Sequence, residues 1–210
     1  KAKQLIDEGV IGDLCVMQAQ FCSYAEPDPN NWRHVKALGG GSMAAKGVYL
    51  IDAFNFFAAH TLQSVFSRET IHAESGVEIG VNATLFYADN VVGQFNSNHY
   101  ACWREDIKLV GRKGTIIIPH AIVTRAQPRH IEVQLGGAYE DEPRENHRYE
   151  FDPANSYQLQ LKRIVHCMKT GDRPIVPLED SVYNLHTTSA LLASSERGQV
   201  VDFTYERSTP

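Results

Sequence analysis

The sequence has few cysteines, and none of them form a closely spaced pair. Cys15, Cys22, Cys102 and Cys167 are scattered over 210 residues, and no CxxC motif is present. Cys15 and Cys22 would lie on opposite faces of one strand, so they could not pair with each other. This usage predicts free, buried thiols in a reducing compartment, and we expect a cytoplasmic protein.

Long apolar runs and basic clusters are also missing. No stretch approaches the ~20 apolar residues that a membrane helix needs. The net charge is −5 and lysines and arginines are dispersed, which argues against a nucleic-acid-binding surface. The nine histidines show no metal-ligand spacing. We therefore predict a protein without membrane, nucleic-acid or metal partners.

No GxGxxG motif follows a strand-like segment, so the chain offers no Rossmann phosphate turn. It starts at Lys1 inside a helix-like segment, and we expect residues 1–210 to be a single domain of a longer protein. A hydrophobic content of 43% and a charged content of 21% are those of an ordinary globular protein. At this length the chain can bury one substantial core.

Hydrophobic periodicity predicts many strands and few helices. Strands are expected at 14–23, 64–70, 77–87, 91–97, 106–110, 115–118, 131–135, 148–151 and 199–204, and helices at 2–8, 43–60, 155–169 and 179–197. The polar segment 136–147 is expected to be a mobile loop. Because strands and helices do not alternate, we predict an α+β fold with a large, mostly antiparallel, open-faced sheet and helices packed on one face.

Of the two C-terminal helices, the first carries an apolar stripe and the second a face that we predict to turn inward. For the first, these residues are Tyr157, Leu161, Ile164, Val165 and Met168. For the second, they are Val182, Leu185, Ser189 and Leu192.

The stretch that organises the chain is a triple glycine, residues 39–41, followed by a helix-forming run. Glycines free the backbone for a turn that side chains would forbid. Ser42 stands where a helix N-cap would, and a core stripe follows at helical spacing. The stripe consists of Met43, Leu50, Phe54 and Phe57, with Gly47 among them for close approach of another backbone.

The opposite face of this helix carries the chemistry. Ala45, Tyr49 and Asp52 share it, with Lys46 close to Tyr49. The helix N-terminus would point its free N–H groups at whatever fills the glycine loop. A phenol and an ammonium there fit a hydroxylated or carbonyl compound. By spacing alone, the same residues also fit a tight turn before a core helix with Tyr49 and Lys46 on its solvated edge.

A tryptophan and an arginine precede the glycines. Trp32 and Arg33 offer a flat apolar wall and a fork of donors, which suit a sugar or a nicotinamide ring. A surface arginine packed on a half-buried tryptophan is an equally good reading.

Residues 31–33, 39–43 and 47–52 resemble the pattern nWR, gap, GGGxLxDxGxHxxD of the C-terminal domain of Gfo/Idh/MocA oxidoreductases. Residues 5–14 and 104–114 are similar to the entry and the glycine hairpin of that domain. The likeness covers most of the chain, and its tyrosine is nearest to the glucose-fructose oxidoreductase and dihydrodiol dehydrogenase branch.

This resemblance implies the substrate-binding and catalytic domain of an NAD(P)-dependent oxidoreductase acting on a sugar, polyol or related diol. Tyr49 would be the acid/base, with Lys46 assisting a lysine of an absent N-terminal domain. An unperturbed phenol titrates near ~10, so a cation must favour its anion.

The remaining roles also follow from the resemblance. The absent domain would hold NAD or NADP, and an oligomer of identical chains would form through the sheet face. Substrate-binding residues would be Trp32, Arg33, Gly40, Gly41 and Asp52, with Arg33 also at the nicotinamide end. Tyr183, Asn184 and His186 would flank the site.

Two positions depart from the pattern. Ala45 replaces the usual aspartate and Tyr49 replaces the usual histidine. The loss of a carboxylate leaves a second hypothesis open, a non-catalytic module that senses a sugar or dinucleotide. A third is a purely structural oligomerisation domain, in which the pocket beside the glycines would hold no ligand.

Overall fold

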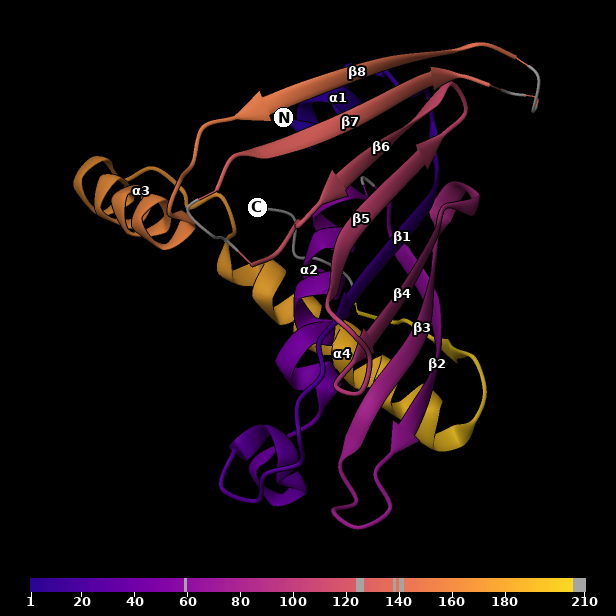
Figure 1. Cartoon of the computed structure of the whole chain (residues 1–210), viewed down its shortest axis with the longest axis vertical. Coiled ribbons are helices and arrows are strands. Elements are labelled where there is room, and N and C mark those ends of the chain that lie inside the picture. Colours follow the sequence, from indigo (N-terminus) through magenta and orange to yellow (C-terminus); the bar gives the residue numbers. More distant parts are fainter. Residues whose placement is uncertain (59, 124–126, 138, 140–141, 206–210) are drawn as a thin grey trace.

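The centre of the molecule is a nine-stranded sheet in the order β8-β7-β6-β5-β1-β4-β3-β2-β9 (Figure 1). The computed structural model describes residues 1–58, 60–123, 127–137, 139 and 142–205. Strands β1 and β4 pair in parallel, whereas the other neighbouring strands pair antiparallel. This confirms the predicted α+β fold with a mostly antiparallel sheet.

The elements follow the predicted order. The strands are β1 Leu14–Cys22, β2 Leu62–Ile71, β3 Glu78–Tyr87, β4 Val92–Asn98, β5 Arg104–Gly111, β6 Gly114–Pro119, β7 Arg129–Gly136, β8 Arg144–Phe151 and β9 Val201–Asp202. The helices are α1 Ala2–Asp7, α2 Val48–Phe57, α3 Ser156–Thr170 and α4 Leu178–Arg197. Short turns of helix are η1 Trp32–His34, η2 Lys36–Leu38, the π-helical η3 Met43–Gly47, and η4 Ala88–Asn90.

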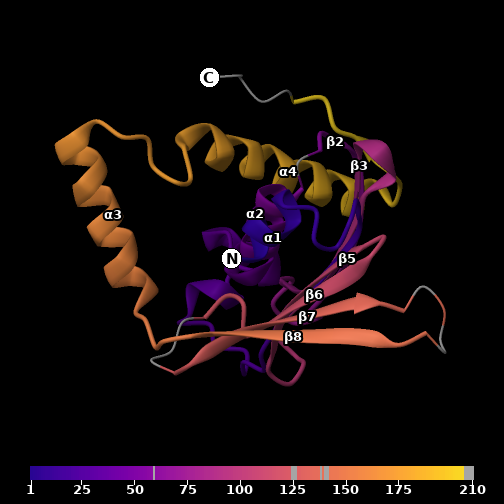
Figure 2. The ribbon, with the colours of Figure 1, turned by 90° about the horizontal axis from the view of Figure 1, so that it is seen from above.

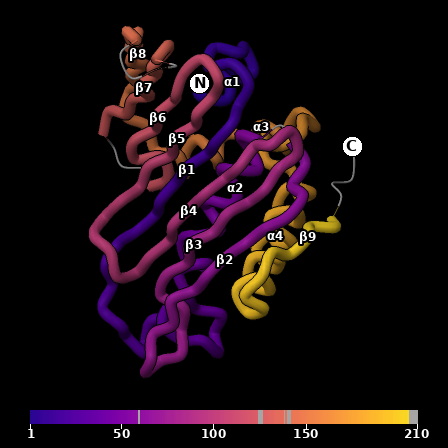
Figure 3. Tube along the Cα trace, turned by 90° about the vertical axis from the view of Figure 1, so that its right-hand side faces the viewer, coloured from indigo at the N-terminus to yellow at the C-terminus, as the bar shows by residue number. Residues whose placement is uncertain are grey.

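Helices α1, α2 and α4 cover one face of the sheet (Figure 2). Leu50 and Phe54 of α2 are fully buried in the core, and Phe54 packs edge-on against Phe95 of β4. Burial of such side chains is the main favourable term in folding. Figure 3 shows the central strands in front of α2 and α4, with the other face of the sheet toward the viewer.

Strand β8 begins within the segment that we expected to be a mobile loop, four residues before the predicted strand. It begins at Arg144, which pairs with Gly136 of β7, so the prediction was wrong for residues 144–147. Residues 138, 140 and 141 lie outside the described part of the chain. The strand is polar because it forms the edge of the sheet, where pairing with one neighbour suffices and side chains meet water.

Helix α3 stands away from the sheet and from the other helices (Figures 1 and 2). It contains no buried residue, and all five members of its predicted apolar stripe are exposed. The predicted apolar stripe is therefore present but not buried in this structure. Periodicity identifies an apolar face but does not say what covers it.

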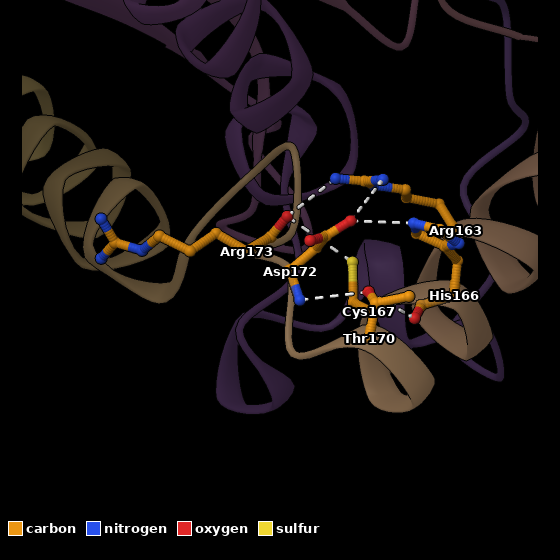
Figure 4. A network of polar contacts seen from close by, with 6 residues as sticks. All are labelled: Arg163, His166, Cys167, Thr170, Asp172 and Arg173. Atoms are coloured by element: carbon orange, nitrogen blue, oxygen red, sulfur yellow. Dashed lines mark hydrogen bonds and ion pairs between the residues drawn. The ribbon is translucent and has the colours of Figure 1, made fainter.

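A polar network fastens the loop after α3 back onto the helix (Figure 4). His166 Nε2 lies 2.8 Å from Asp172 Oδ2, and Arg163 donates to the Arg173 carbonyl at 3.0 Å. The Cys167 thiol donates to the same carbonyl at 3.5 Å. The C-terminal end of α3 is therefore held by contacts with the loop that follows it, and not by contacts with the sheet.

Helix α4 turns a different face inward from the one predicted. Tyr183, Thr187, Leu191 and Ser194 are buried, whereas Leu185 and Leu192 are exposed. The reason is polar contact with β2, because Ser67 Oγ donates to the Leu191 carbonyl at 2.5 Å and Ser67 N–H donates to Ser194 Oγ at 3.1 Å. Small polar residues let the helix approach the strand closely.

Candidate functional site

The triple glycine makes a turn whose shape excludes side chains at two positions. A Cβ at Gly40 would lie 2.4 Å from the Trp32 carbonyl oxygen. Gly39 has φ 73°, and Gly41 has φ 138° and donates its N–H to the Arg33 carbonyl at 2.9 Å. The turn therefore folds back onto η1, which places Trp32 and Arg33 beside the glycines, as predicted.

The helix N-terminus after this turn is capped by a residue that the sequence did not indicate. Ser42 was expected to be the cap, but its hydroxyl instead lies 3.0 Å from Ser97 Oγ and 3.1 Å from the Ser97 carbonyl. The Glu78 carboxylate of β3 accepts the N–H groups of Ser42, at 2.7 Å, and of Met43. The cap comes from a distant strand, so no local motif could reveal it.

The first turn of the organising helix is π-helical, and this changes which way Lys46 points. The π turn has more residues per turn than an α-helix, so it shifts the phase of η3 against α2. Lys46 is only 5% exposed, and its Nζ donates to the carbonyls of Ser23, at 3.0 Å, and Asn98, at 2.6 Å. Burial lowers its pKa to about 8. The structure directs Lys46 toward the sheet, not to the face of Tyr49 where we expected it.

The core stripe of the helix is confirmed. Met43, Leu50, Phe54 and Phe57 are all buried. The prediction that Gly47 admits another backbone was wrong, because the space is taken by the side chain of Met43, whose sulfur would lie 2.7 Å from a Cβ.

Tyr49 is 52% exposed and forms part of the wall of two pockets. The first, of about 690 Å³, lies between α2 and α4; its lining includes Gly39, Gly40, Met43, Tyr49, Asp52, Glu78, Asn184, Leu185 and Thr188. The second, of about 460 Å³, lies between α2 and strands β5 to β7; its lining includes Lys1, Tyr49, Asp52, Phe56, Ile107 and Ile118. A ligand on either side of α2 can reach the same phenol.

A chain of hydrogen bonds holds Asp52 at the rim of both pockets. Asn184 of α4 donates to Asp52 Oδ1 at 2.6 Å, and Asn55 donates to Asn184 Oδ1 at 2.8 Å. Tyr87 OH in turn donates to Asn55 Oδ1 at 2.9 Å. Partial burial raises the pKa of Asp52, and the bond from Asn184 opposes the rise. The network fixes one carboxylate near Tyr49 from the core outward.

Aromatic rings surround Tyr49 on the sheet side. Phe21, near the end of β1, lies edge-on to Tyr49 with ring centroids 6.0 Å apart and edge-on to Trp103 at 6.1 Å. Neither Phe21 nor Trp103 was predicted as a site residue, because both lie far from the glycine motif along the chain. On η1, the Arg33 guanidinium lies 4.8 Å from the centroid of the Trp32 ring, and both side chains are exposed.

Tyr183 and His186 do not join this group. Tyr183 is buried, and its hydroxyl accepts the N–H of Leu62 at 3.2 Å. His186 stacks on Tyr205 with centroids 4.0 Å apart. Asn184, between them in sequence, faces the pocket because α4 rotates about 100° per residue.

Two buried histidines lie behind the glycine turn. The rings of His34 and His99 meet edge-on at 5.6 Å. His99 is 2% exposed, and within the described part of the chain neither of its ring nitrogens makes a well-formed hydrogen bond. Burial, with a smaller effect of the Lys46 ammonium, lowers the pKa of His99 to about 4.

Two further properties concern the described residues as a whole. None of the helices in the ranges given above is both long and apolar enough to cross a membrane. A search of the same ranges finds no cluster of three or more His, Cys, Asp or Glu side chains that could hold a metal ion. All four cysteines are free.

Comparison with known proteins gives relatives along most of the chain. Glucose-fructose oxidoreductase domain-containing protein 1 of Xenopus tropicalis is 29% identical over 139 residues, which are 56% of this chain and 34% of that protein. D-xylose 1-dehydrogenase (NADP(+)) 2 of Haloferax volcanii is 24% identical over 174 residues, covering 79% of this chain and 49% of that protein.

Among solved structures, the aldose-aldose oxidoreductase of Caulobacter crescentus, complexed with glycerol, superimposes with a TM-score of 0.83. It is 25% identical, and the match covers 96% of this chain and 59% of that one. The chain thus spans less than two thirds of the length of each of these three relatives.

The sequence profile of the GFO/IDH/MocA C-terminal domain matches residues 1–117. These residues include the glycine turn, α2 and the sheet from β1 to β5. The chain belongs to the GFO/IDH/MocA C-terminal domain family.

Proposed function

We propose that this chain is the substrate-binding domain of an NAD(P)-dependent oxidoreductase that acts on a CH–OH group of a sugar, polyol or related diol. The observation that carries the proposal is Tyr49, an exposed phenol on the helix after the glycine turn that borders two pockets. The names of the relatives, which include a xylose dehydrogenase and an aldose-aldose oxidoreductase, support this substrate class.

In this proposal Tyr49 handles the proton. Its phenolic oxygen accepts the proton of the substrate hydroxyl as the carbonyl forms, and returns it in the reverse direction. A nicotinamide cofactor, when bound, accepts or donates the hydride. Lys46 is the candidate assistant through its charge, acting from behind the helix, since its N–H donors are directed to strand carbonyls.

Binding of the substrate would use the polar groups around the same phenol. Asp52, held by Asn184, can accept hydroxyl hydrogen bonds. Gly40 and Gly41 shape the turn at the pocket, and Gly40 itself lines it. We assign Trp32 and Arg33 to a sugar or nicotinamide ring, because they offer an exposed ring with a guanidinium stacked on it. Tyr183 and His186 support α4 in this proposal, since their side chains have partners elsewhere.

The residues described here do not fit the phosphates of a dinucleotide. The N–H groups of Ser42 and Met43 after the glycine turn are already taken by the Glu78 carboxylate, which would repel a phosphate. We therefore propose that NAD or NADP is held mainly by another domain of the complete protein.

The test is the Tyr49→Phe variant of the complete protein. We expect its kcat/KM to fall by about 10²- to 10⁴-fold, the range for loss of a general acid/base. Tyr157→Phe is the matched control, because it removes an exposed phenol from α3, away from both pockets. Equal activity of Tyr49→Phe and the control would rule out the assigned role.

A second candidate function is a sensor that binds the same ligands without chemistry. Ala45 favours it, because the family pattern has a carboxylate at this position. Cofactor binding without turnover across a panel of sugars and inositols would support the sensor. We further propose that the chains form an oligomer through the open face of the sheet, where the polar side chains of β1, β3 and β4 gather.

A further inference from the structure

Glu78 links the start of β3 to the turn that walls the pocket. It is the first residue of β3, and its side chain lies on the helix side of the sheet, where it reaches the start of η3. One carboxylate oxygen accepts the Ser42 N–H at 2.7 Å and the other accepts the Met43 N–H. A Cβ at Gly41 would lie 2.8 Å from Glu78 Oε1, so only glycine admits the carboxylate here.

This contact caps the start of η3 and also contributes to the wall of the pocket. Glu78 also lines the 690 Å³ pocket together with Gly39, Gly40, Tyr49 and Asp52. The carboxylate therefore fixes the turn from the pocket side, and any shift of it moves the pocket wall. The hydroxyl of Ser42 cannot replace it, because that group is engaged with Ser97.

We propose that Glu78 is a positioning residue, whose ionised carboxylate holds the glycine turn and the start of the Tyr49 helix in the shape that binds substrate. The substrate part of this inference rests on the proposed function. A protonated carboxyl has one good acceptor oxygen instead of two, so it cannot hold both N–H groups equally well. Protonation of Glu78 therefore loosens the turn.

Because of where Glu78 lies, its carboxylate gains a proton, and the turn loosens, near neutral pH. Burial raises its pKa to about 7, and the N–H groups of Met43 and Ser42 oppose the rise. The ionisable groups near it are Glu69 on β2, Lys46 on η3, Tyr49 and Asp52 on α2, and His99 near the Gly41 carbonyl. Lys46 has a pKa of about 8 and His99 of about 4, and His34 also lies behind the turn, so the variants below and not the midpoint alone identify the titrating group.

The first test uses amide NMR of the 210-residue chain, labelled selectively with ¹⁵N-serine and ¹⁵N-methionine. We expect the amide shifts of Ser42 and Met43 to titrate with a midpoint near pH 7, and this needs no variant. Glu78→Gln should abolish the titration. Glu105→Gln should keep it, although Glu105 is likewise buried and accepts two backbone N–H groups, those of Ile122 and Val123. Amides that do not titrate between pH 5.5 and 8.5, or that still titrate in Glu78→Gln, would overturn the proposal.

The second test measures KM and kcat of the complete protein from pH 6 to 8. We expect KM to rise about three- to tenfold as the pH falls, with a smaller change in kcat, and Glu78→Gln to show a high KM without this dependence. A merely structural role would leave the pH profile of KM unchanged in the variant, and that result would contradict the inference. Titrating amides in a protein with no turnover would contradict the proposed function and leave the role of Glu78 in the turn intact.

Discussion

Lys46 shows how one π-helical turn can redirect a side chain and so give the residue a different role. A regular α-helix from Met43 would place Lys46 near Tyr49, and the sequence gives no sign of the π turn at Met43–Gly47. In the structure the ammonium ties the residue after β1 to the last residue of β4, through the carbonyls of Ser23 and Asn98. The side chain therefore contributes to the stability of the site as well as to its charge.

We predict that Lys46→Met lowers the free energy of unfolding by about 1–3 kcal/mol, because the carbonyls of Ser23 and Asn98 lose a charged donor, although the Asn98 carbonyl keeps the Ser23 N–H. Urea unfolding of the chain measures this. Lys36→Met is the control, since Lys36 is exposed on η2. The same small loss in both variants would show that the two carbonyl contacts do not stabilise the fold.

His99 predicts a pH dependence with a defined sign. Its pKa falls from 6.5 to about 4 in the folded chain, so the folded state binds fewer protons than the unfolded state between these values. Its contribution to stability is complete above pH 6.5 and is lost as the pH falls toward 4. Between pH 7.5 and 5, wild type should lose about 2 kcal/mol of stability relative to His99→Phe. Urea unfolding at each pH measures this difference. If the free energies of unfolding of the two proteins changed equally with pH over this range, the assignment would be contradicted.

At the scale of elements, helices α3 and α4 show what periodicity can and cannot predict. Both helices were predicted from sequence, but the face predicted to turn inward on α4 was wrong, and the apolar stripe predicted on α3 is not buried. In α4 the hydrogen bonds with β2 are made by Leu191, Ser194 and Ser195, and two of these are polar residues that hydrophobicity does not mark. In α3 the apolar stripe is real but exposed in this chain.

Matched substitutions in the two helices test this assignment. We expect Leu191→Ala to cost about 2–5 kcal/mol, because the side chain is fully buried. Leu161→Ala should change stability by less than ~0.5 kcal/mol, since that leucine is 63% exposed. Thermal or urea unfolding of the 210-residue chain compares them. A similar cost for both would mean that α3 packs on the rest of the chain in solution.

The candidate site was predictable only where its residues are close in sequence. The glycine turn, Tyr49, Asp52 and the Trp32–Arg33 pair follow from one stretch of the chain. Glu78, Phe21 and Trp103 reach the site through sheet pairing, which brings β1, β3 and β5 to one side of α2. Contacts of this kind are set by the tertiary fold, and no local pattern encodes them.

For the whole molecule, composition and strand pattern predicted the α+β class and the open sheet. They did not reveal the parallel pairing of β1 with β4, which joins two segments about 75 residues apart. The parallel pair forms the centre of the sheet, and β1 leads along the chain to the glycine turn, after which η3 carries Lys46 and α2 carries Tyr49. Its place follows from the burial of α2 against both strands and not from local propensity.

The open face of the sheet leads to a prediction about assembly. Gln94 is exposed on β4, near the centre of this face. If two copies meet face to face, Gln94→Arg places an arginine of one copy near the arginine of the other, and like charges repel. In a sedimentation experiment, the variant should therefore shift toward the monomer. A wild-type chain that is monomeric at all concentrations would rule out assembly of this chain alone through its sheet.

The central claim is the oxidoreductase function, and one measurement tests it most directly. The complete protein is titrated with NADH and NADPH, and nicotinamide fluorescence is then followed while sugars and inositols are added, for wild type and Tyr49→Phe. The account predicts cofactor binding in both proteins and substrate-dependent oxidation or reduction in wild type alone. Cofactor binding without turnover across the panel would contradict it and favour the sensor, with Ala45 as the residue to restore to aspartate first.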